Sequence, residues 1–272
     1  MELDLSGRVV LVTGAARGIG RVIAETFVAE RSVVVGVDVA VDALGWLDDA
    51  RAAAGLDGAA LACDVTDGPA TRALVDDVVA RFGRVDVLVN NAGINVEGRI
   101  EDLDDDAWDR CFAVNVGGVF KMCRAVAPAM KAQRSGRIVN AASFAAIVPS
   151  VGAGAYAASK SAVVQLTRTL AGELGPWGIT ANAYAPGMIP TAMNGFADMP
   201  AATQDRLLDT LTLRRWGEPQ EVADVVCFLA SDAARYVTGT LIDVSGGKLA
   251  TQLPQKAYEL PDAPGADERV QP

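Results

Sequence analysis

The stretch that most constrains the fold is a short apolar run leading through three glycines into a helical pattern. Residues 8–13 read RVVLVT, which predicts a buried strand, and apolar residues recur at helical spacing over 22–28. Gly14, Gly18 and Gly20 lie between them. A strand that enters a helix through glycines gathers backbone N–H groups and the positive helix end at one place, where no side chain blocks a phosphate. The stretch predicts a pyrophosphate site, although lone glycine loops also mark ordinary turns.

Strand and helix patterns alternate along most of the 272 residues. Further strands are expected at 32–37, 59–63, 85–89, 138–141, 179–183 and 240–244, and helices at about 68–82, from 104, at 155–174 and at 218–229. This alternation predicts an α/β fold with a doubly wound parallel seven-stranded sheet (Rossmann type) and right-handed crossovers. No internal repeat is visible, so residues 1–249 are expected to form a single domain.

Composition excludes several kinds of site and partner. The chain has no histidine, which excludes Ser-His-Asp hydrolysis and histidine-ligated metals, and we expect no metal. A net charge of −10 without a basic cluster argues against nucleic acid. The start, MELDLSGR, lacks a signal peptide's apolar region, and the charge-poor stretch at 143–159 is too rich in glycine and serine to span a membrane. The four cysteines form no CxxC pair, so we expect a soluble, cytoplasmic protein with reduced thiols.

Asp38 ends the second expected strand, about twenty positions past the glycines. A carboxylate there accepts hydrogen bonds from the adenosine ribose and repels a 2′-phosphate. No Arg or Lys follows closely to offset the repulsion, and the nearby Arg17 could instead face the pyrophosphate. The pattern predicts NAD rather than NADP, the alternative being a solvated carboxylate at a strand end. Asp64, at the end of the third strand, could reach the adenine amino group.

A proton-transfer site is predicted between Ser143 and Lys160. Tyr156 and Lys160 stand four residues apart, on one face of a helix. A tyrosine pKa of about 10 falls when an ammonium and a cofactor's positive ring stabilise the phenolate, and a value of about 7 requires roughly 4 kcal/mol. Ser143 could hydrogen-bond the same substrate oxygen. A Tyr-x-x-x-Lys pair alone is also common on helix surfaces.

The acidic run at 101–106 resembles a binding patch but better fits a helix start capped by Asp104. Three apolar residues at i, i+4 and i+8 of this helix are expected to face the core: Trp108, Phe112 and Val116. Asn115, beside that face, would need buried partners and could hold a water leading to Lys160.

Two later segments have distinct patterns. Residues 191–212 are predicted to form a mobile amphipathic lid, with apolar positions at Met193, Phe196, Leu207, Leu208 and Leu211. The extension at 250–272 has four prolines and a charged end, which ordinarily suggest disorder. We hypothesise that it packs on a neighbouring subunit near an active-site entrance, with anchors at Leu253, Tyr258 and Leu260.

With these residues in view, the chain from about residue 5 to 249 resembles the short-chain dehydrogenase/reductase family. The resemblance rests on Thr13-Gly14-(x)3-Gly18-Ile19-Gly20, Asn90-Asn91-Ala92-Gly93, Asn115, Ser143, Tyr156-(x)2-Ser159-Lys160 and Pro186-Gly187-Met188-Ile189-Pro190-Thr191. Each motif is modest alone, but together, in order and at family spacing, they are highly specific.

The resemblance implies hydride transfer between the nicotinamide C4 and a carbinol carbon. Tyr156 would be the general acid/base and Ser143 would orient the substrate oxygen. Lys160 would lower the pKa of the tyrosine and bind the nicotinamide ribose, and Asn115 would support a water-mediated proton path. The residues expected to hold the cofactor are Gly14, Arg17, Gly18, Ile19, Gly20, Asp38, Asp64, Val65, Asn91, Ala92, Gly93, Tyr156, Lys160, Pro186, Gly187, Ile189 and Thr191. A homotetramer built on the helices that carry Asn115 and Tyr156 is also implied.

Within the family, the chain is most similar to 3-oxoacyl-carrier-protein reductases, which typically prefer NADPH. Because Asp38 argues against NADPH, the predicted function is NAD-dependent oxidation of a secondary alcohol, with ketone reduction as the reverse. The alternatives are an NADPH-dependent 3-oxoacyl reductase, a catalytically silent dinucleotide-sensing regulator, and a sugar-nucleotide epimerase or dehydratase. A regulator usually lacks the tyrosine or lysine, and an epimerase normally has another glycine spacing and a C-terminal substrate domain. The expected substrate residues are Asn95, Ser143, Phe144, Val151, Tyr156 and Met188.

Overall fold

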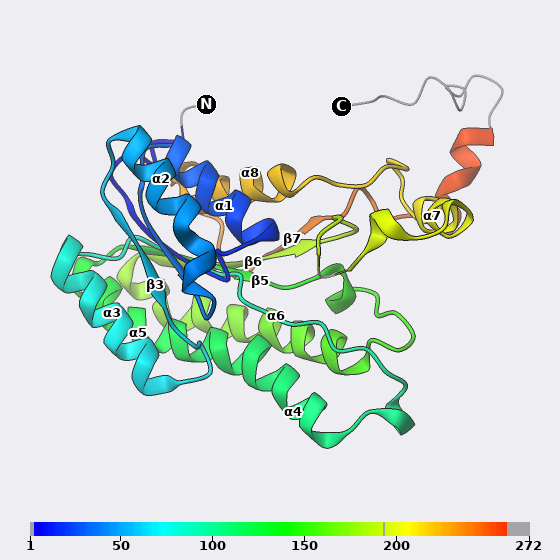
Figure 1. The fold of residues 1–272 in the computed structure, drawn as a ribbon, viewed down its shortest axis with the longest axis horizontal. Helices are drawn as coiled ribbons and strands as arrows, with labels where there is room; N and C mark the ends of the chain where they lie inside the picture. The colour runs from blue at the N-terminus through cyan, green and yellow to red at the C-terminus, as the bar shows by residue number, and fades with distance from the viewer. Residues whose placement is uncertain (1–2, 193, 260–272) are drawn as a thin grey trace.

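Seven parallel strands form the centre of the structure, a computed structural model that describes residues 3–192 and 194–259 (Figure 1). They are β1 (Val9–Thr13), β2 (Val33–Asp38), β3 (Gly58–Ala62), β4 (Val87–Asn90), β5 (Gly136–Ala141), β6 (Ile179–Pro186) and β7 (Leu241–Val244). Their order across the sheet is β3-β2-β1-β4-β5-β6-β7, with every neighbouring pair parallel. The expected doubly wound sheet is confirmed. Its order reverses between β1 and β4, where ligands bind at the carboxyl ends of such sheets.

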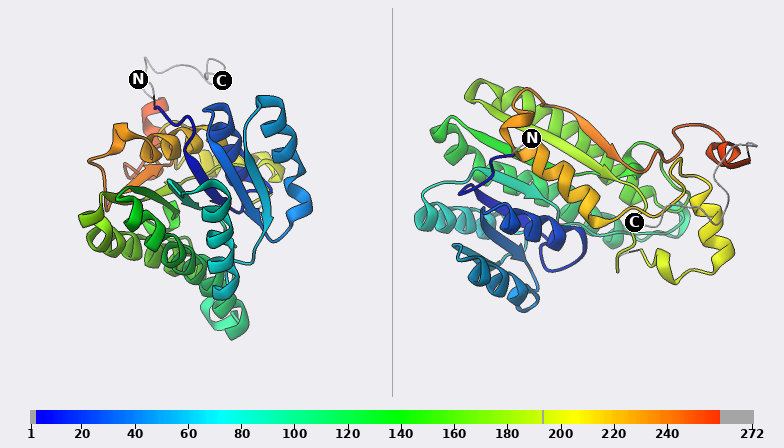
Figure 2. Two further views of the ribbon diagram at one scale, coloured as in Figure 1. Left: turned by 90° about the vertical axis from the view of Figure 1, so that its left-hand side faces the viewer. Right: turned by 90° about the horizontal axis from the view of Figure 1, so that it is seen from above.

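Helices cover both faces of the sheet (Figures 1 and 2). One face carries α1 (Gly18–Ala29), α2 (Gly45–Ala54) and α8 (Pro219–Ala230), and the other carries α3 (Gly68–Phe82), α5 (Val119–Gln133) and α6 (Gly154–Leu174). Helix α2 has no counterpart among the helices expected from the sequence. Leu47 is its one buried residue among those described, so its apolar periodicity is weak. No helix in the described part of the chain has both the length and the apolar character needed to cross a bilayer.

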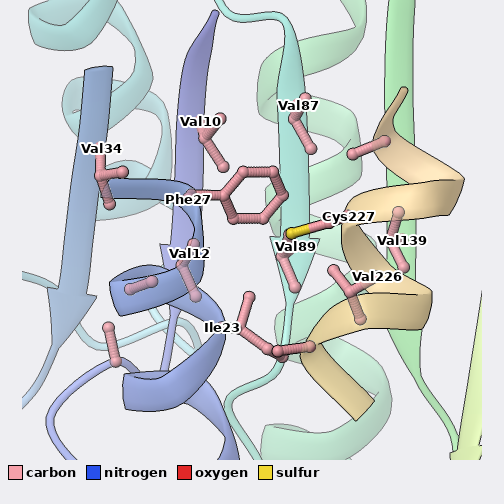
Figure 3. Packing of buried hydrophobic residues seen from close by; sticks show 14 of the residues in the cluster. Val10, Val12, Ile23, Phe27, Val34, Val87, Val89, Val139, Val226 and Cys227 are labelled. Carbon is pink, nitrogen blue, oxygen red and sulfur yellow. The ribbon is translucent and has the colours of Figure 1, made fainter. Parts of the chain in front are cut away.

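The strands bury both of their faces, as parallel strands between helices do. Alternate residues of β1 divide between the two cores: Val10 and Val12 face α1 and α8, whereas Val9 and Leu11 face α3 and α5. Figure 3 shows Phe27 of α1 over the first of these layers. Both layers hold the strands rigidly, so that the loops at their carboxyl ends are fixed relative to one another.

The helix expected from Asp104 is divided by a π-helical turn. Asp104 caps it as expected, because its Oδ1 accepts a hydrogen bond from the N–H of Ala107 at 2.6 Å. Helix α4 (Asp105–Phe112) then passes into the π-helical turn (Ala113–Gly118) before α5 begins. A π-helical turn holds more residues than an α-helical turn, so it rotates the following residues relative to the preceding ones.

The expected core face of this helix is therefore wrong in part. Val116 packs against the core, but Trp108 is 38% exposed and stacks on the half-buried Phe112, with ring centroids 4.9 Å apart. Cys111 and Asn115 are buried instead. Cys111 and Asn115, four residues apart, share the buried face, and both hydrogen-bond with Ser159 of α6.

The lid segment lies beyond the ends of the strands. It includes α7 (Ala201–Leu208) and the buried Leu211, and Phe196 stacks on Trp216 with ring centroids 5.5 Å apart. Leu207 and Leu208 are half-buried. The remaining apolar position, Met193, lies outside the described residues.

The described part of the C-terminal extension contacts the lid of its own chain. The Tyr258 hydroxyl donates to the Thr212 carbonyl at 2.7 Å, and the Arg214 guanidinium lies 5.9 Å from the Tyr258 ring centroid. Leu253 is half-exposed, and Leu260 lies outside the described residues. Figure 1 shows this segment next to α7.

Candidate active site

The glycine loop between β1 and α1 forms a cradle that side chains would fill. A Cβ on Gly14, whose φ is +67°, would lie 2.8 Å from the Cα of Ala92. A Cβ on Gly20 would collide with the Gly14 carbonyl and the Asn91 amide. Gly18 also has a positive φ, and the nearest described side chain to its Cβ position is that of Thr191, at 3.8 Å. Because Arg17 forms no side-chain cap on α1, the N–H groups of the first turn face the cradle, which fits a dinucleotide phosphate.

Thr13 and Asn91 lock this loop to the loop after β4. The Thr13 hydroxyl accepts hydrogen bonds from the N–H groups of Asn91 and Ala92, each at 3.1 Å. The Asn91 amide donates to the Gly14 carbonyl at 3.1 Å and accepts from the Tyr184 hydroxyl at 3.1 Å. Thr13 opens the glycine motif but was not predicted as a site residue. These hydrogen bonds of the Asn91 side chain hold the cradle in shape, and its predicted contact with the cofactor stays a prediction.

Two carboxylates stand at neighbouring strand ends beside the cradle. Asp38 is held by two backbone N–H groups, those of Ala16 and Ala40, each at 3.1 Å from a carboxylate oxygen. Asp64 is exposed and accepts a hydrogen bond from the N–H of Thr66 at 2.8 Å. Its neighbour Val65 is buried against Gly118. The Arg17 side chain is exposed at the start of α1.

Ser143, Tyr156 and Lys160 meet at the carboxyl end of β5. Ser143 follows the strand, and its hydroxyl accepts the N–H of Ala145 at 3.1 Å. Tyr156 and Lys160 lie one turn apart on α6, with the Lys160 Nζ 5.7 Å from the tyrosine ring centroid. Nζ also donates to the Ala141 carbonyl at 2.8 Å, which fixes the ammonium beneath the site.

Burial shifts the pKa values of Tyr156 and Lys160 in the chain without a cofactor. Burial raises the pKa of the Tyr156 phenol, and the hydrogen bond with Ser143 opposes that rise. Burial lowers the pKa of Lys160 to about 8. Without a cofactor the buried site disfavours the phenolate, so the expected fall in the tyrosine pKa, which also depends on the cofactor's positive ring, stays a prediction. The positive charge of a bound cofactor would be needed to reverse the direction.

Asn115 joins the site to the loop that follows β4. Its side chain accepts from the N–H of Ile94 at 2.9 Å and donates to the Ile94 carbonyl at 3.0 Å. It also donates to the Ser159 hydroxyl at 3.0 Å, and Ser159 in turn donates to the Tyr156 carbonyl at 2.7 Å. Ser159, three residues after the tyrosine, belongs to the Tyr-Lys motif but was not predicted to be a site residue. A Cβ on Gly93 would lie 3.1 Å from the Asn115 Oδ1 and 3.4 Å from the Lys160 Nζ, so all three groups meet there.

The segment after β6 closes the other side of the site. Gly187 packs so tightly on the turn after β7 that its Cβ would lie 2.6 Å from the Ser245 Cα. It is flanked by the half-buried Pro186 and the buried Met188 and Ile189. A cavity of about 230 Å³ opens between these two apolar residues, the segment from Leu213 to Glu221 and the stretch at 243–247. The Thr191 N–H donates to Asn194 Oδ1 at 3.1 Å.

The expected substrate residues are not all brought together. Phe144 and Met188 are buried near the site, and Asn95 donates to Glu97 at 2.8 Å in the loop after β4. Ile19, which was expected to hold the cofactor and not the substrate, is half-buried at the start of α1. The Val151 side chain is fully exposed in the single chain, so its part in a pocket stays a prediction.

Comparison with known proteins shows that the resemblance covers most of the chain. A sequence profile described as enoyl-(acyl carrier protein) reductase matches residues 14–248. The 3-oxoacyl-[acyl-carrier-protein] reductase of Thermotoga maritima is 40% identical over 247 residues, which cover 90% of this chain and 99% of that protein. The chain belongs to the short-chain dehydrogenase/reductase family. It is therefore an oxidoreductase of a family that uses a nicotinamide cofactor.

Solved short-chain dehydrogenases of several specificities share the fold. A gluconate 5-dehydrogenase from Burkholderia cenocepacia, in complex with NADP and tartrate, has a TM-score of 0.88 and 33% identity, and the match covers 92% of this chain and 98% of that one. An NAD+-bound xylitol dehydrogenase has a TM-score of 0.86 and 31% identity, with coverage of 90% and 100%.

Lys160 gives this dehydrogenase/reductase a pH-dependent stability. Its pKa is about 8 in the folded protein, whereas an unfolded chain keeps a lysine pKa of about 10.4. Between these values the unfolded state binds more protons, so this residue makes the free energy of unfolding rise with pH. We expect the free energy of unfolding of the wild type, measured with urea and relative to Lys160→Met, to increase from about pH 8 to about pH 10. The exposed Lys256→Met is the control and should show no such trend; a constant difference for Lys160 would contradict the shifted pKa.

Proposed function

We propose that the protein interconverts a ketone and a secondary alcohol at the site formed by Ser143, Tyr156 and Lys160. The observation that carries the proposal is the position of this group, which lies beside the glycine cradle at the carboxyl end of one sheet. A bound nicotinamide dinucleotide supplies the hydride acceptor or donor. The experiment that tests the proposal is turnover of an alcohol and ketone panel by the wild type and by Tyr156→Phe.

Each residue of the site has a distinct task in this proposal. The Ser143 hydroxyl and the Tyr156 phenol bind the substrate oxygen together, and Tyr156 gives a proton to the alkoxide or takes one from the alcohol. The ammonium of Lys160 favours the phenolate form and binds the nicotinamide ribose with N–H groups that Ala141 leaves free. Asn115 holds the preceding loop and supports a water-mediated proton path. The remaining cofactor residues keep the contacts predicted above, with the carboxamide at Ile189 and Thr191.

Two substrate classes are supported by different observations. The first-ranked curated relatives are named as 3-oxoacyl-[acyl-carrier-protein] reductases, and this favours the NADPH-dependent 3-oxoacyl reductase over the NAD-dependent alcohol dehydrogenase. Asp38 favours the NAD-dependent alcohol dehydrogenase instead. Its carboxylate is fixed at the end of β2, where the 2′-phosphate of NADPH would lie. Solved neighbours exist with either cofactor, NADP in one and NAD+ in another. An acetoacetyl thioester and a set of neutral secondary alcohols, assayed with both cofactors, distinguish the classes.

The role of Asp38 gives a direct prediction. Asp38→Asn removes the charge and keeps the side-chain shape, so the preference for NADH over NADPH, as a ratio of kcat/KM values, should fall by about 10–100-fold. The exposed Asp42→Asn, four residues on, is the control for loss of a nearby charge. An unchanged ratio in Asp38→Asn would mean that another group, such as Arg17, selects the cofactor.

We also propose a cytoplasmic homotetramer built on the helices that carry Asn115 and Tyr156. The half-exposed Phe120 and the exposed Trp108 lie on this side of the molecule and support such an interface. The four free, buried cysteines support a reducing compartment. The extension packs on its own lid in the described part, and we propose that it also reaches a neighbouring subunit near the site entrance. Sedimentation velocity of the full chain and of a chain ending at residue 249 measures the assembly state.

A further inference from the structure

Lys248 lies close to the loop that carries Ser143 and takes no part in the chemistry assigned above. It follows β7 in the turn Ser245-Gly246-Gly247-Lys248, and its Nζ lies 5.5 Å from the ring centroid of Phe144. Phe144 is the buried residue directly after Ser143. The two residues are 104 positions apart, so the sequence alone gives no sign that a cation stands next to the residue after the serine.

The backbone that carries Lys248 is fixed. Gly246 and Gly247 both have positive φ values, of 65° and 72°, which reverse the chain direction at little steric cost because they have no Cβ. The N–H of Lys248 donates to the Ser245 hydroxyl at 3.1 Å, and Ser245 itself packs on Gly187. The turn therefore touches the predicted nicotinamide segment on one side and the serine loop on the other. A side chain leaving this turn is directed by a rigid frame.

The charge of Lys248 has no carboxylate partner within 4 Å among the described residues, whose ion pairs are all made by arginines. Its side chain is partly buried, and burial lowers its pKa. A half-buried ammonium on the face of an aromatic ring gains little from that ring and loses hydration. An anion brought by the substrate would supply the missing partner.

We infer that Lys248 binds a carboxylate of the substrate, so that the preferred substrate is an oxo acid or the matching hydroxy acid. The inference rests on the proposed ketone–alcohol interconversion, since the carbonyl must lie at Ser143 and Tyr156. Because Phe144 directly follows Ser143, a ligand whose carbonyl lies at that serine can extend a few bonds towards the ammonium beside the Phe144 ring. Lys248 thereby selects against neutral ketones and neutral acyl thioesters of the same length.

The test compares levulinate with its methyl ester, which lacks the carboxylate charge and is larger by one methyl group. The wild type should have a kcat/KM about 10–100-fold higher for levulinate, as expected for a charge-assisted hydrogen bond. Lys248→Met should remove this preference while keeping turnover of the ester, and Lys248→Arg should keep most of it. The matched control is Lys131→Met, which removes the same charge near the end of α5, before the amino end of β5 and away from the site at the carboxyl ends of the strands. Oxo acids with one to three more methylenes then measure the spacing between the ammonium and the reacting carbon.

The outcomes separate the inference from the function on which it rests. If the wild type turns over the ester as well as the acid, or if Lys248→Met keeps the preference, the inference is overturned and the proposed function stands. If no ketone is turned over by the wild type, the proposed function fails. Binding of levulinate to the dinucleotide complex, measured by calorimetry, then decides the inference: equal affinity in the wild type and Lys248→Met overturns it, and weaker binding in Lys248→Met alone supports it.

Discussion

Tyr156→Phe is expected to lower kcat for ketone reduction by about 10²–10⁴-fold, the usual contribution of a positioned general acid. The substitution removes one hydroxyl and keeps the ring, so α6 and the cradle should be unaffected. Only the group that hydrogen-bonds with Ser143 and that would transfer the proton is lost. Dinucleotide affinity, measured by fluorescence titration, should stay within about threefold because the N–H groups of α1 and the Asp38 carboxylate are unchanged.

The matched control for this experiment is Tyr236→Phe, because Tyr236 is fully exposed and far along the chain from the site. It should keep wild-type kcat. Full activity in Tyr156→Phe would show that another group is the acid. A wild type that binds the dinucleotide and turns over no member of the panel would instead favour the silent, dinucleotide-sensing regulator.

Gly20→Ala is expected to destabilise the protein by about 1–3 kcal/mol, or more, and to weaken dinucleotide binding. The added methyl group would collide with the Gly14 carbonyl and the Asn91 amide, which are hydrogen-bonded to each other at 3.1 Å. Both are backbone or tightly held groups, so neither can move without opening the cradle. Urea denaturation and a dinucleotide titration measure the two effects.

Gly45→Ala is the control, with the opposite sign expected. Gly45 is exposed at the start of α2 with a helical backbone conformation, and a Cβ there meets no described atom within 4 Å. Alanine favours the helix over glycine by about 0.5–1 kcal/mol, so the free energy of unfolding should rise by that amount. Destabilisation by both substitutions would contradict the prediction, because it would show that an added methyl group destabilises the protein even where it meets no described atom.

Much of the fold could be predicted because its signals are local. The apolar runs of β1 and β4 and the glycines before α1 indicate strand, turn and helix within short windows, and strands alternating with helices leave few topologies. The same holds for Asp38, which marks a strand end, and for Tyr156 and Lys160, whose spacing puts them on one helical face. Helix α2 was missed because Leu47 alone of its described residues is buried.

Other features depend on contacts between distant segments. Trp108 was expected in the core, but Cys111 and Asn115 are the buried residues there, because both hydrogen-bond with Ser159 of α6, which is distant in sequence. The hydrogen bonds that join Thr13, Asn91 and Tyr184 link three strands that are adjacent only in the folded sheet. The sequence shows that these residues are polar, but it does not show what they bind.

The sequence by itself determined the fold class, and it was enough to predict the glycine cradle and the residues proposed to react. These follow from periodicity, from glycine at points of close approach and from spacing along one helix. The tertiary structure alone decided that burial raises the pKa of Tyr156, that Asn115 holds the loop before the site, and that Lys248 faces Phe144. Burial and proximity are properties of the packed chain, because they depend on which segments displace water from one another.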